Sequence, residues 1–237
     1  MYCAIWRMQI ILMQLTIGNI FTADTLEQMV HVLPRLRWSD GQRTAGSAAR
    51  SVKKNRQADV SRGVGRQLTM DISEAIHGHP VILAAARPKR ISPILLSRTE
   101  KEGGYGPHLD NAILGKPPSR MRGDLSFTLF LSDPDDYDGG ELVVHETARV
   151  ESHKPGLGDL VLYPAGEIHE VKPVTRGVRY AAVGWIESMI RDAHARAILF
   201  DLENLKVSLQ QQGENLGAEQ MTVNKIIGNL LRRWGDL

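Results

Sequence analysis

The sequence predicts a mainly β domain with flanking helices, centred on a barrel or double-sheet jelly roll. From Val81 to Ser188, short apolar runs alternate with turns rich in Gly, Pro and Asp, a spacing typical of β-sandwiches and barrels. On both sides of this region the apolar residues recur with the helical period instead. The chain has 237 residues, of which 42% are hydrophobic and 24% charged, enough for one sizeable domain with an appendage.

We therefore expect three regions in the chain. Residues 1–80 form an N-terminal strand and supporting helices, residues 81–188 form the jelly-roll core, and residues 189–237 form a C-terminal helical extension. The N-terminal helices are expected to belong to the same domain as the core, because a jelly roll needs cover for its apolar faces.

The N-terminal region combines one strand, two helices and a polar loop. Ser, Thr and Asp favour helix starts, and Gly favours helix ends. On these signals we expect a strand from Met8 (itself a candidate start in place of Met1), a helix from Thr22 or Asp24 to about Leu36 with Pro34 in its last turn, a polar loop over Ser39 to Asn55, and a helix from Val60 to His77 stopped by Gly78.

Apolar runs mark the strands of the central region and are followed by two helices. The runs are VILAAA, ISPILL, DLSFTLFLS, ELVVHE, DLVLYP, IHEVKPV and VRYAAVGWI. The helices are expected over about Ser188 to Gln212 and about Thr222 to Trp234. Because the last helix is amphipathic, it is a candidate contact for a homodimer.

Composition narrows the protein class. The single cysteine, Cys3, excludes an intrachain disulfide and makes a cytoplasmic location the default. The apolar opening is interrupted by polar residues and lacks the features of an export signal or membrane span. A formal net charge of +2 is too small to indicate nucleic acid. We expect neither a membrane nor a nucleic-acid partner.

Charge is unevenly distributed along the chain. Residues 35–66 carry a net charge of +7 and residues 124–148 a net charge of −7. Two solvated or mutually attracting faces would explain this pattern. Alternatively, the basic segment receives an acidic substrate or cosubstrate, with Lys53, Lys54 and Asn55 at a pocket mouth rather than in a solvated loop.

A candidate metal site lies in the β region. His108 and Asp110 are two residues apart, and on a strand residues i and i+2 face the same side, with Leu109 pointing into the opposite layer. His169, after the GDLVLYP run, is the best third ligand; His145 and His153 compete, as a rim and a loop residue. Two imidazoles and one carboxylate on one face of a metal form the facial triad of non-haem Fe(II) oxygenases.

A candidate anion site follows the triad. Arg179 comes ten residues after His169, on the apolar run VRYAAVGWI, and a guanidinium aimed into a barrel suits a carboxylate. Arg176 is expected in a turn facing water, and Gly139 and Gly140 in a hairpin with positive φ. Two aromatic residues are expected in the core rather than as substrate platforms: Tyr163 and Trp185.

Over nearly its whole length the sequence resembles the PKHD-type hydroxylases, relatives of the prolyl 4-hydroxylases. The matching stretches are VKKN at 52–55 with Gln57, HLDNA at 108–112, DLS at 124–126, TLFLSDPDDYDGGELV at 128–143, GDLVLYP at 158–164, HEVKPVTRGVR at 169–179, WIESMIRD at 185–192 and NLLRRW at 229–234. The resemblance implies a double-stranded β-helix, Fe(II) bound by His108, Asp110 and His169, 2-oxoglutarate bound by Arg179, O2 as oxidant, and L-ascorbate to restore oxidised iron.

Two positions depart from the family pattern. Thr99 stands where the family usually has a tyrosine, and Pro107 where it often has an asparagine. If the tyrosine supports the cosubstrate, Thr99 cannot reach as far, and Tyr105 is a candidate replacement.

The resemblance implies hydroxylation of a substrate coupled to decarboxylation of 2-oxoglutarate to succinate. A peptidyl-prolyl group and a siderophore-like small molecule remain open as substrates, the latter through the family's association with iron uptake and hence iron homeostasis. The alternative is a non-catalytic metal or iron sensor on the same jelly roll. A cupin-like isomerase or hydrolase using another divalent ion is a third reading.

Overall fold

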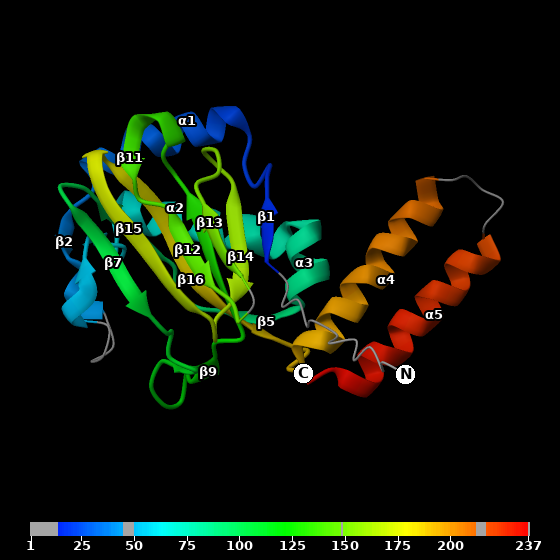
Figure 1. Ribbon diagram of the computed structural model, residues 1–237. Helices are drawn as coiled ribbons and strands as arrows, with labels where there is room; N and C mark the ends of the chain where they lie inside the picture. Colours follow the sequence, from blue (N-terminus) through cyan, green and yellow to red (C-terminus); the bar gives the residue numbers. More distant parts are fainter. Residues whose placement is uncertain (1–13, 45–49, 148, 212–216, 237) are drawn as a thin grey trace, which may run out of the picture.

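A computed structural model describes residues 14–44, 50–147, 149–211 and 217–236. Two antiparallel sheets face each other, helices cover the outer side of the larger sheet, and a two-helix hairpin extends from one side (Figure 1). The expected strand from Met8 lies mostly outside the described residues, and the described part of it begins at Leu15.

The larger sheet places β16 near its middle. Its order is β1-β14-β10-β16-β6-β4-β2, and β5 also pairs with β16. The strands are β1 (Leu15–Ile17), β2 (Trp38–Asp40), β4 (Arg56–Ala58), β5 (Pro88–Ile91), β6 (Leu95–Thr99), β10 (Leu125–Phe130), β14 (Leu160–Pro164) and β16 (Arg179–Ser188).

The smaller sheet places β15 and β7 side by side. Its order is β13-β12-β15-β7-β3, and β11 also pairs with β15. The strands are β3 (Lys53–Lys54), β7 (Gly103–His108), β11 (Tyr137–Gly139), β12 (Leu142–His145), β13 (Val150–His153) and β15 (Ile168–Gly177). A separate hairpin joins β8 (Ile113–Leu114) to β9 (Met121–Arg122).

Strand β10 shows how the sequence assigns one side of the larger sheet to the core. All six of its residues are buried, and alternate side chains face opposite sides. Leu125, Phe127 and Leu129 belong to the main hydrophobic core, which the helices share. Ser126 and Thr128 line a cavity between the sheets, and of the three core residues only Phe127 also lines it. The polar residues of an otherwise apolar strand therefore mark the site.

The N-terminal helices agree with the sequence signals, and the expected loop carries short elements. Helix α1 (Ala23–Val32) is capped by the Thr22 side chain and continues as the 3-10 turn η1 (Leu33–Arg35), which holds Pro34. Helix α2 spans Gly63–Gly78. The segment expected as a plain loop contains β2, β3 and the 3-10 turns η2 (Gly41–Thr44) and η3 (Arg50–Val52), because β3 pairs with the edge of β7.

The run VILAAA was expected as a strand, and that prediction is wrong. Residues Pro80–Ala86 form helix α3, which ends at Arg87 in the left-handed conformation. Proline at the first turn and three successive alanines favour a helix. Ile82, Ala85 and Ala86 are buried, which is the spacing of one helical face.

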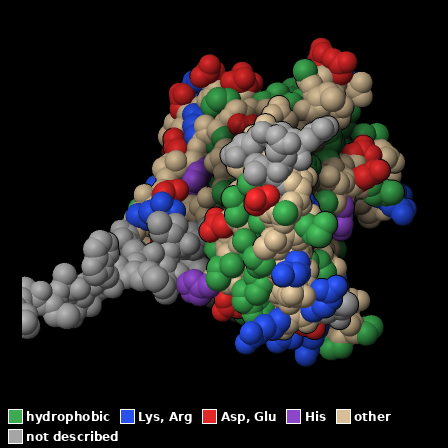
Figure 2. All heavy atoms as spheres, turned by 90° about the vertical axis from the view of Figure 1, so that its right-hand side faces the viewer, with side chains coloured by type: hydrophobic (Ala, Val, Ile, Leu, Met, Phe, Trp, Pro, Cys, Tyr) green, Lys and Arg blue, Asp and Glu red, His purple; other side chains and the backbone are tan. Residues whose placement is uncertain are grey.

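The C-terminal region forms the expected helices as a hairpin. Helix α4 (Ala193–Gln211) begins where Asp192 Oδ1 accepts from the backbone N–H of Ala195, and it packs against α5 (Gly217–Trp234). Figure 2 looks onto this hairpin and shows hydrophobic side chains among charged ones. The homodimer contact and the region boundaries at 80 and 188 stay predictions. No helix within the described ranges is both long and apolar enough to span a membrane.

Candidate metal and cosubstrate site

Three metal-binding side chains converge between the sheets, as the sequence predicted. His169 on β15 lies directly opposite His108 on β7, and Asp110 follows the end of β7. One ligand atom from each of these residues lies within 4.8 Å of the others. Strand pairing therefore brings a local His-x-Asp pair together with a histidine that is far away in the sequence.

Both histidines are oriented by the same backbone contact. Nδ1 of His108 is 2.8 Å from the carbonyl oxygen of Gly106, and Nδ1 of His169 is 2.9 Å from that of Glu167. Because a carbonyl oxygen can only accept, each Nδ1 donates, and each Nε2 keeps its lone pair for a metal. Burial, together with the nearby His169, lowers the pKa of His108 to about 4, so its imidazole is neutral at physiological pH.

A serine that the sequence analysis did not single out holds the carboxylate. The Ser126 hydroxyl donates to Asp110 Oδ2 at 2.7 Å. Its position on β10, in the matching stretch DLS, was the available signal. Leu109 was expected to point into the opposite layer from His108 and Asp110, and that prediction is wrong, because all three line the same cavity. The strand ends at His108, and Leu109 is 56% exposed at the cavity.

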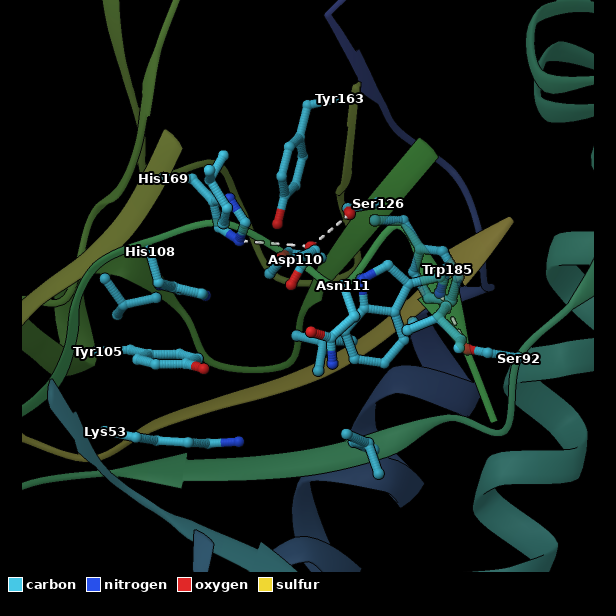
Figure 3. A pocket seen from close by; sticks show the side chains of 18 of the residues that line it. Lys53, Ser92, Tyr105, His108, Asp110, Asn111, Ser126, Tyr163, His169 and Trp185 are labelled. Atoms are coloured by element: carbon cyan, nitrogen blue, oxygen red, sulfur yellow. Dashed lines mark hydrogen bonds and ion pairs between the residues drawn. The ribbon is translucent and has the colours of Figure 1, made fainter. Parts of the chain in front are cut away.

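The triad lines a cavity of about 530 Å³, a volume within the range of small-molecule sites. Tyr105 stacks on the His108 ring with centroids 3.5 Å apart, and Lys53 Nζ lies 5.1 Å from the Tyr105 centroid. Figure 3 shows Lys53, Tyr105 and His108 as successive layers, with Tyr163 on the other side of the triad. Burial, followed by the effect of Asp110, raises the pKa of Tyr105 to about 12, so its hydroxyl stays protonated.

Arg179 is 2% exposed and interacts electrostatically with Tyr163, which lines the cavity. Its guanidinium is 4.8 Å from the Phe130 ring, and burial lowers its pKa, opposed by Tyr137 and Tyr163. Within the described part of the chain, Nε and Nη2 of Arg179 have no hydrogen-bond partner. A buried cation with two unmatched donors is costly, and a carboxylate with two acceptor oxygens fits that need.

Tyr163 connects the cation to the metal site. Tyr163 and Trp185 were both expected in the core. Tyr163 belongs to a buried core cluster and also lines the cavity. Trp185 is only half-buried and lines the cavity without belonging to a core cluster of the described residues, so the prediction is wrong for it. The Tyr163 ring is 5.2 Å from that of His169. Burial raises the pKa of Tyr163 and the charge of Asp110 adds to the rise, whereas a hydrogen bond with Thr128 and the charge of Arg179 oppose it.

Two of the positions discussed in the sequence, Thr99 and Gly140, lie next to Arg179. Thr99 pairs directly with Arg179 across β6 and β16 and is buried, whereas Tyr105 stacks at the metal end. Gly139 and Gly140 have the expected positive φ, 72° and 69°. A Cβ on Gly140 would lie 2.9 Å from Cδ of Arg179, so this glycine leaves room for the arginine stem.

The competing residues lie outside the triad. Arg176 is exposed, as predicted, but it lies on β15 rather than in a turn, where it pairs with Asp138 at 2.7 Å. His145 is the last residue of β12, and its Nε2 lies 3.1 Å from Oε1 of Glu170. His153 was expected in a loop but ends β13, where it lies 2.9 Å from Gln14. Lys53 and Asn55 line the cavity, whereas Lys54 is exposed.

Comparison with known proteins defines the class first. Residues 94–187, which include the triad and Arg179, match the family model of the 2OG-Fe(II) oxygenase superfamily. A prolyl hydroxylase from Trichoplax adhaerens, solved in complex with a peptide fragment of hypoxia inducible factor, has a similar fold. The TM-score is 0.53 at 18% identity, covering 74% of this chain and 83% of that one. This likeness confirms the jelly-roll core.

Closer relatives define the family. The chain is 46% identical to a PKHD-type hydroxylase of Hyphomonas neptunium, over 94% of this chain and 100% of that protein. It is 41% identical to one from Synechococcus sp. JA-2-3B'a(2-13), over 95% and 100%. The chain therefore belongs to the PKHD-type hydroxylases, within the 2OG-Fe(II) oxygenases. It is a 2-oxoglutarate-dependent dioxygenase, a class that uses Fe(II), 2-oxoglutarate and O2.

Proposed function

We propose that Nε2 of His108, the carboxylate of Asp110 and Nε2 of His169 bind Fe(II), and that Arg179 binds the far carboxylate of 2-oxoglutarate. The observation that carries this proposal is the buried guanidinium of Arg179, which interacts with Tyr137 but has two donors, Nε and Nη2, without partners among the described residues. It accompanies a His-Asp-His group that can hold a metal. The donor set fits the metal, since imidazole and carboxylate ligands on one face are those of non-haem Fe(II) sites.

When bound, iron, 2-oxoglutarate and O2 together supply the oxidant for C–H hydroxylation and release succinate and CO2. The chain supplies position and exclusion of water. Arg179 fixes the cosubstrate from its far end, and the Gly106 and Glu167 carbonyls fix the two imidazoles. Ser126 holds Asp110 in place. The substrate then has the remaining cavity wall around Tyr105 and Trp185.

We infer a hydroxylation of either a peptidyl-prolyl group or a siderophore-like small molecule. The prolyl hydroxylase of similar fold, solved with a peptide, supports the first. A cavity of about 530 Å³ within the barrel supports the second. The family resemblance supports a link to iron homeostasis and the use of ascorbate. The single cysteine supports a cytoplasmic location.

The rival function is a metal sensor without turnover. It explains the triad equally well, but it gives the buried Arg179 guanidinium no anion to bind. Binding of 2-oxoglutarate therefore separates the two functions.

The test is succinate formation from 2-oxoglutarate. Protein loaded anaerobically with Fe(II) is exposed to air, with and without ascorbate. We expect slow turnover without added substrate, prolonged by ascorbate and lost in His108→Ala, while that variant keeps the β-sheet circular dichroism of the wild type. Undiminished turnover in His108→Ala would contradict the metal assignment. Metal binding without any 2-oxoglutarate binding would favour the sensor.

A further inference from the structure

We propose that Lys53 binds a carboxylate on the substrate, so that the enzyme selects acids over their uncharged analogues. This inference rests on the proposed function, because it assigns the part of the cavity that Fe(II) and 2-oxoglutarate leave to the substrate.

Alternation along one segment separates an inner from an outer set of side chains. Lys53, Asn55 and Gln57 all line the cavity, whereas Lys54 and Arg56 between them are exposed. This is the period of an extended chain. Within the basic segment 35–66, the structure therefore distinguishes a side chain that lines the cavity, Lys53, from exposed basic side chains such as Lys54 and Arg56. Only one of this segment's lysines faces the site.

The Lys53 side chain is buried and held by its strand, unlike a lysine on the surface. The residue is 6% exposed, and its strand β3 pairs with β7, with Lys53 opposite Tyr105. The ammonium lies over the Tyr105 ring, whose other face stacks on His108. A group bound by Lys53 is thus held one aromatic ring away from a metal ligand, which fixes its distance from the carbon to be oxidised.

The position of Lys53 assigns it to the substrate rather than to the cosubstrate. Tyr163, which interacts with Arg179, stands on the opposite side of the triad from Lys53 (Figure 3). In the proposed function His108, Asp110 and His169 would hold the metal and Arg179 the far carboxylate of 2-oxoglutarate, so both carboxylates of the cosubstrate would already be bound. Lys53 faces the other part of the cavity.

The chemistry of the side chain indicates the substrate group. An ammonium held over an aromatic ring at a cavity wall donates most strongly to an anionic acceptor, and a carboxylate on the substrate is such an acceptor. Burial lowers the pKa of Lys53 to about 8, so the side chain is still mainly protonated at pH 7, at a desolvation cost that an anionic ligand offsets.

Equilibrium binding tests this inference without turnover. Protein loaded with Mn(II) and saturating 2-oxoglutarate is titrated by calorimetry with N-acetyl amino acids, each as the free acid and as the primary amide. A second panel of capped tripeptides compares central Asp or Glu with Asn or Gln. The first panel represents small free acids and the second acidic side chains of a peptide. Wild type is compared with Lys53→Met and with Lys54→Met, the matched control on the same strand.

We expect at least one acid to bind wild type about 10- to 100-fold more tightly than its amide, as for a charge-assisted hydrogen bond. Lys53→Met should remove this preference, and Lys54→Met should keep it within about twofold. Equal binding of acids and amides, binding of no acid, or an acid preference that survives Lys53→Met would each overturn the inference. Failure of 2-oxoglutarate itself to bind the Mn(II) protein would instead contradict the proposed function.

Discussion

The two cations of the site, Arg179 and Lys53, lie in contrasting parts of the fold. Arg179 begins β16, a strand hydrogen-bonded to β6 on one side and to β10 on the other. Lys53 belongs to the two-residue edge strand β3, which pairs only with β7 among the described strands. Both side chains are buried, at 2% and 6% exposure.

This difference separates a residue fixed by the centre of the larger sheet from one held at the edge of the smaller sheet, and both lie in stretches that match the family. A residue on a central strand is fixed by the same packing that stabilises the barrel, so a cosubstrate anchor there is part of the core. A residue on an edge segment can be replaced without disturbing the ladder on both sides. We therefore expect the Arg179 side of the cavity to determine the reaction and the Lys53 side to determine the substrate.

The largest effect is expected from Arg179→Met. Loss of a buried charge-assisted pair should weaken 2-oxoglutarate binding by about 100-fold or more. The apo protein should lose little stability, because burial disfavours the charge of Arg179 and two of its donors lack partners within the described residues, which offsets the loss of its contacts with Tyr137 and Phe130. Calorimetry and thermal unfolding with and without 2-oxoglutarate measure both. Arg176→Met, an exposed arginine, is the control, and an equal loss in that variant would contradict the specific role of Arg179.

Gly140→Ala should disturb the same end of the cavity by steric means. The new Cβ would lie 2.9 Å from Arg179, Tyr137 and Val174 atoms at a residue with φ of 69°. We expect a loss of ~2 to 3 kcal/mol in the free energy of unfolding, measured by urea denaturation, together with weaker 2-oxoglutarate binding. Gly166→Ala is the control, because no atom lies within 4 Å of its Cβ position. Equal effects of the two changes would argue against packing at Arg179 as the cause.

Ser126→Ala tests the metal site between the two ends. Removing the hydroxyl that donates to Asp110 should lower metal affinity by about 10- to 100-fold, as for other residues that orient ligands. Competition with a chelator measures the affinity. Ser152→Ala, on the exposed side of β13, should leave it unchanged. A chelator midpoint that does not move in Ser126→Ala would show that Asp110 needs no such support.

The smallest effect is expected at Lys53 and is one of stability. The unfolded chain keeps the Lys53 proton up to about pH 10.5, but burial makes the folded chain release it near pH 8. Lys53 therefore destabilises the fold below pH 8, and this cost disappears as the pH rises to 10.5. Lys53→Met should be ~1 to 3 kcal/mol more stable than wild type at pH 7 and lose this advantage by pH 10.5. A gain that does not depend on pH would show that the charge is not its cause.

The sequence predicted the metal site more completely than it predicted the walls around it. A His-x-Asp pair at the end of β7 and a distal histidine are visible as residue types, and the fold needed only to pair β7 with β15. Ser126 and Tyr163 were missed, because a serine or tyrosine within an apolar strand does not reveal which face it takes until neighbouring strands are placed. The run VILAAA was misassigned because short apolar segments suit a strand or a buried helix equally.

The most direct test of the account is whether Arg179 and the metal hold the same molecule from its two ends. Anaerobic Fe(II) protein is titrated with 2-oxoglutarate and with pyruvate, which lacks the far carboxylate, and the charge-transfer absorption is followed. We predict that wild type binds 2-oxoglutarate about 100-fold or more tightly than pyruvate, and that Arg179→Met binds both weakly and nearly equally. A preference for 2-oxoglutarate that survives in Arg179→Met would place the far carboxylate elsewhere and contradict the assignment.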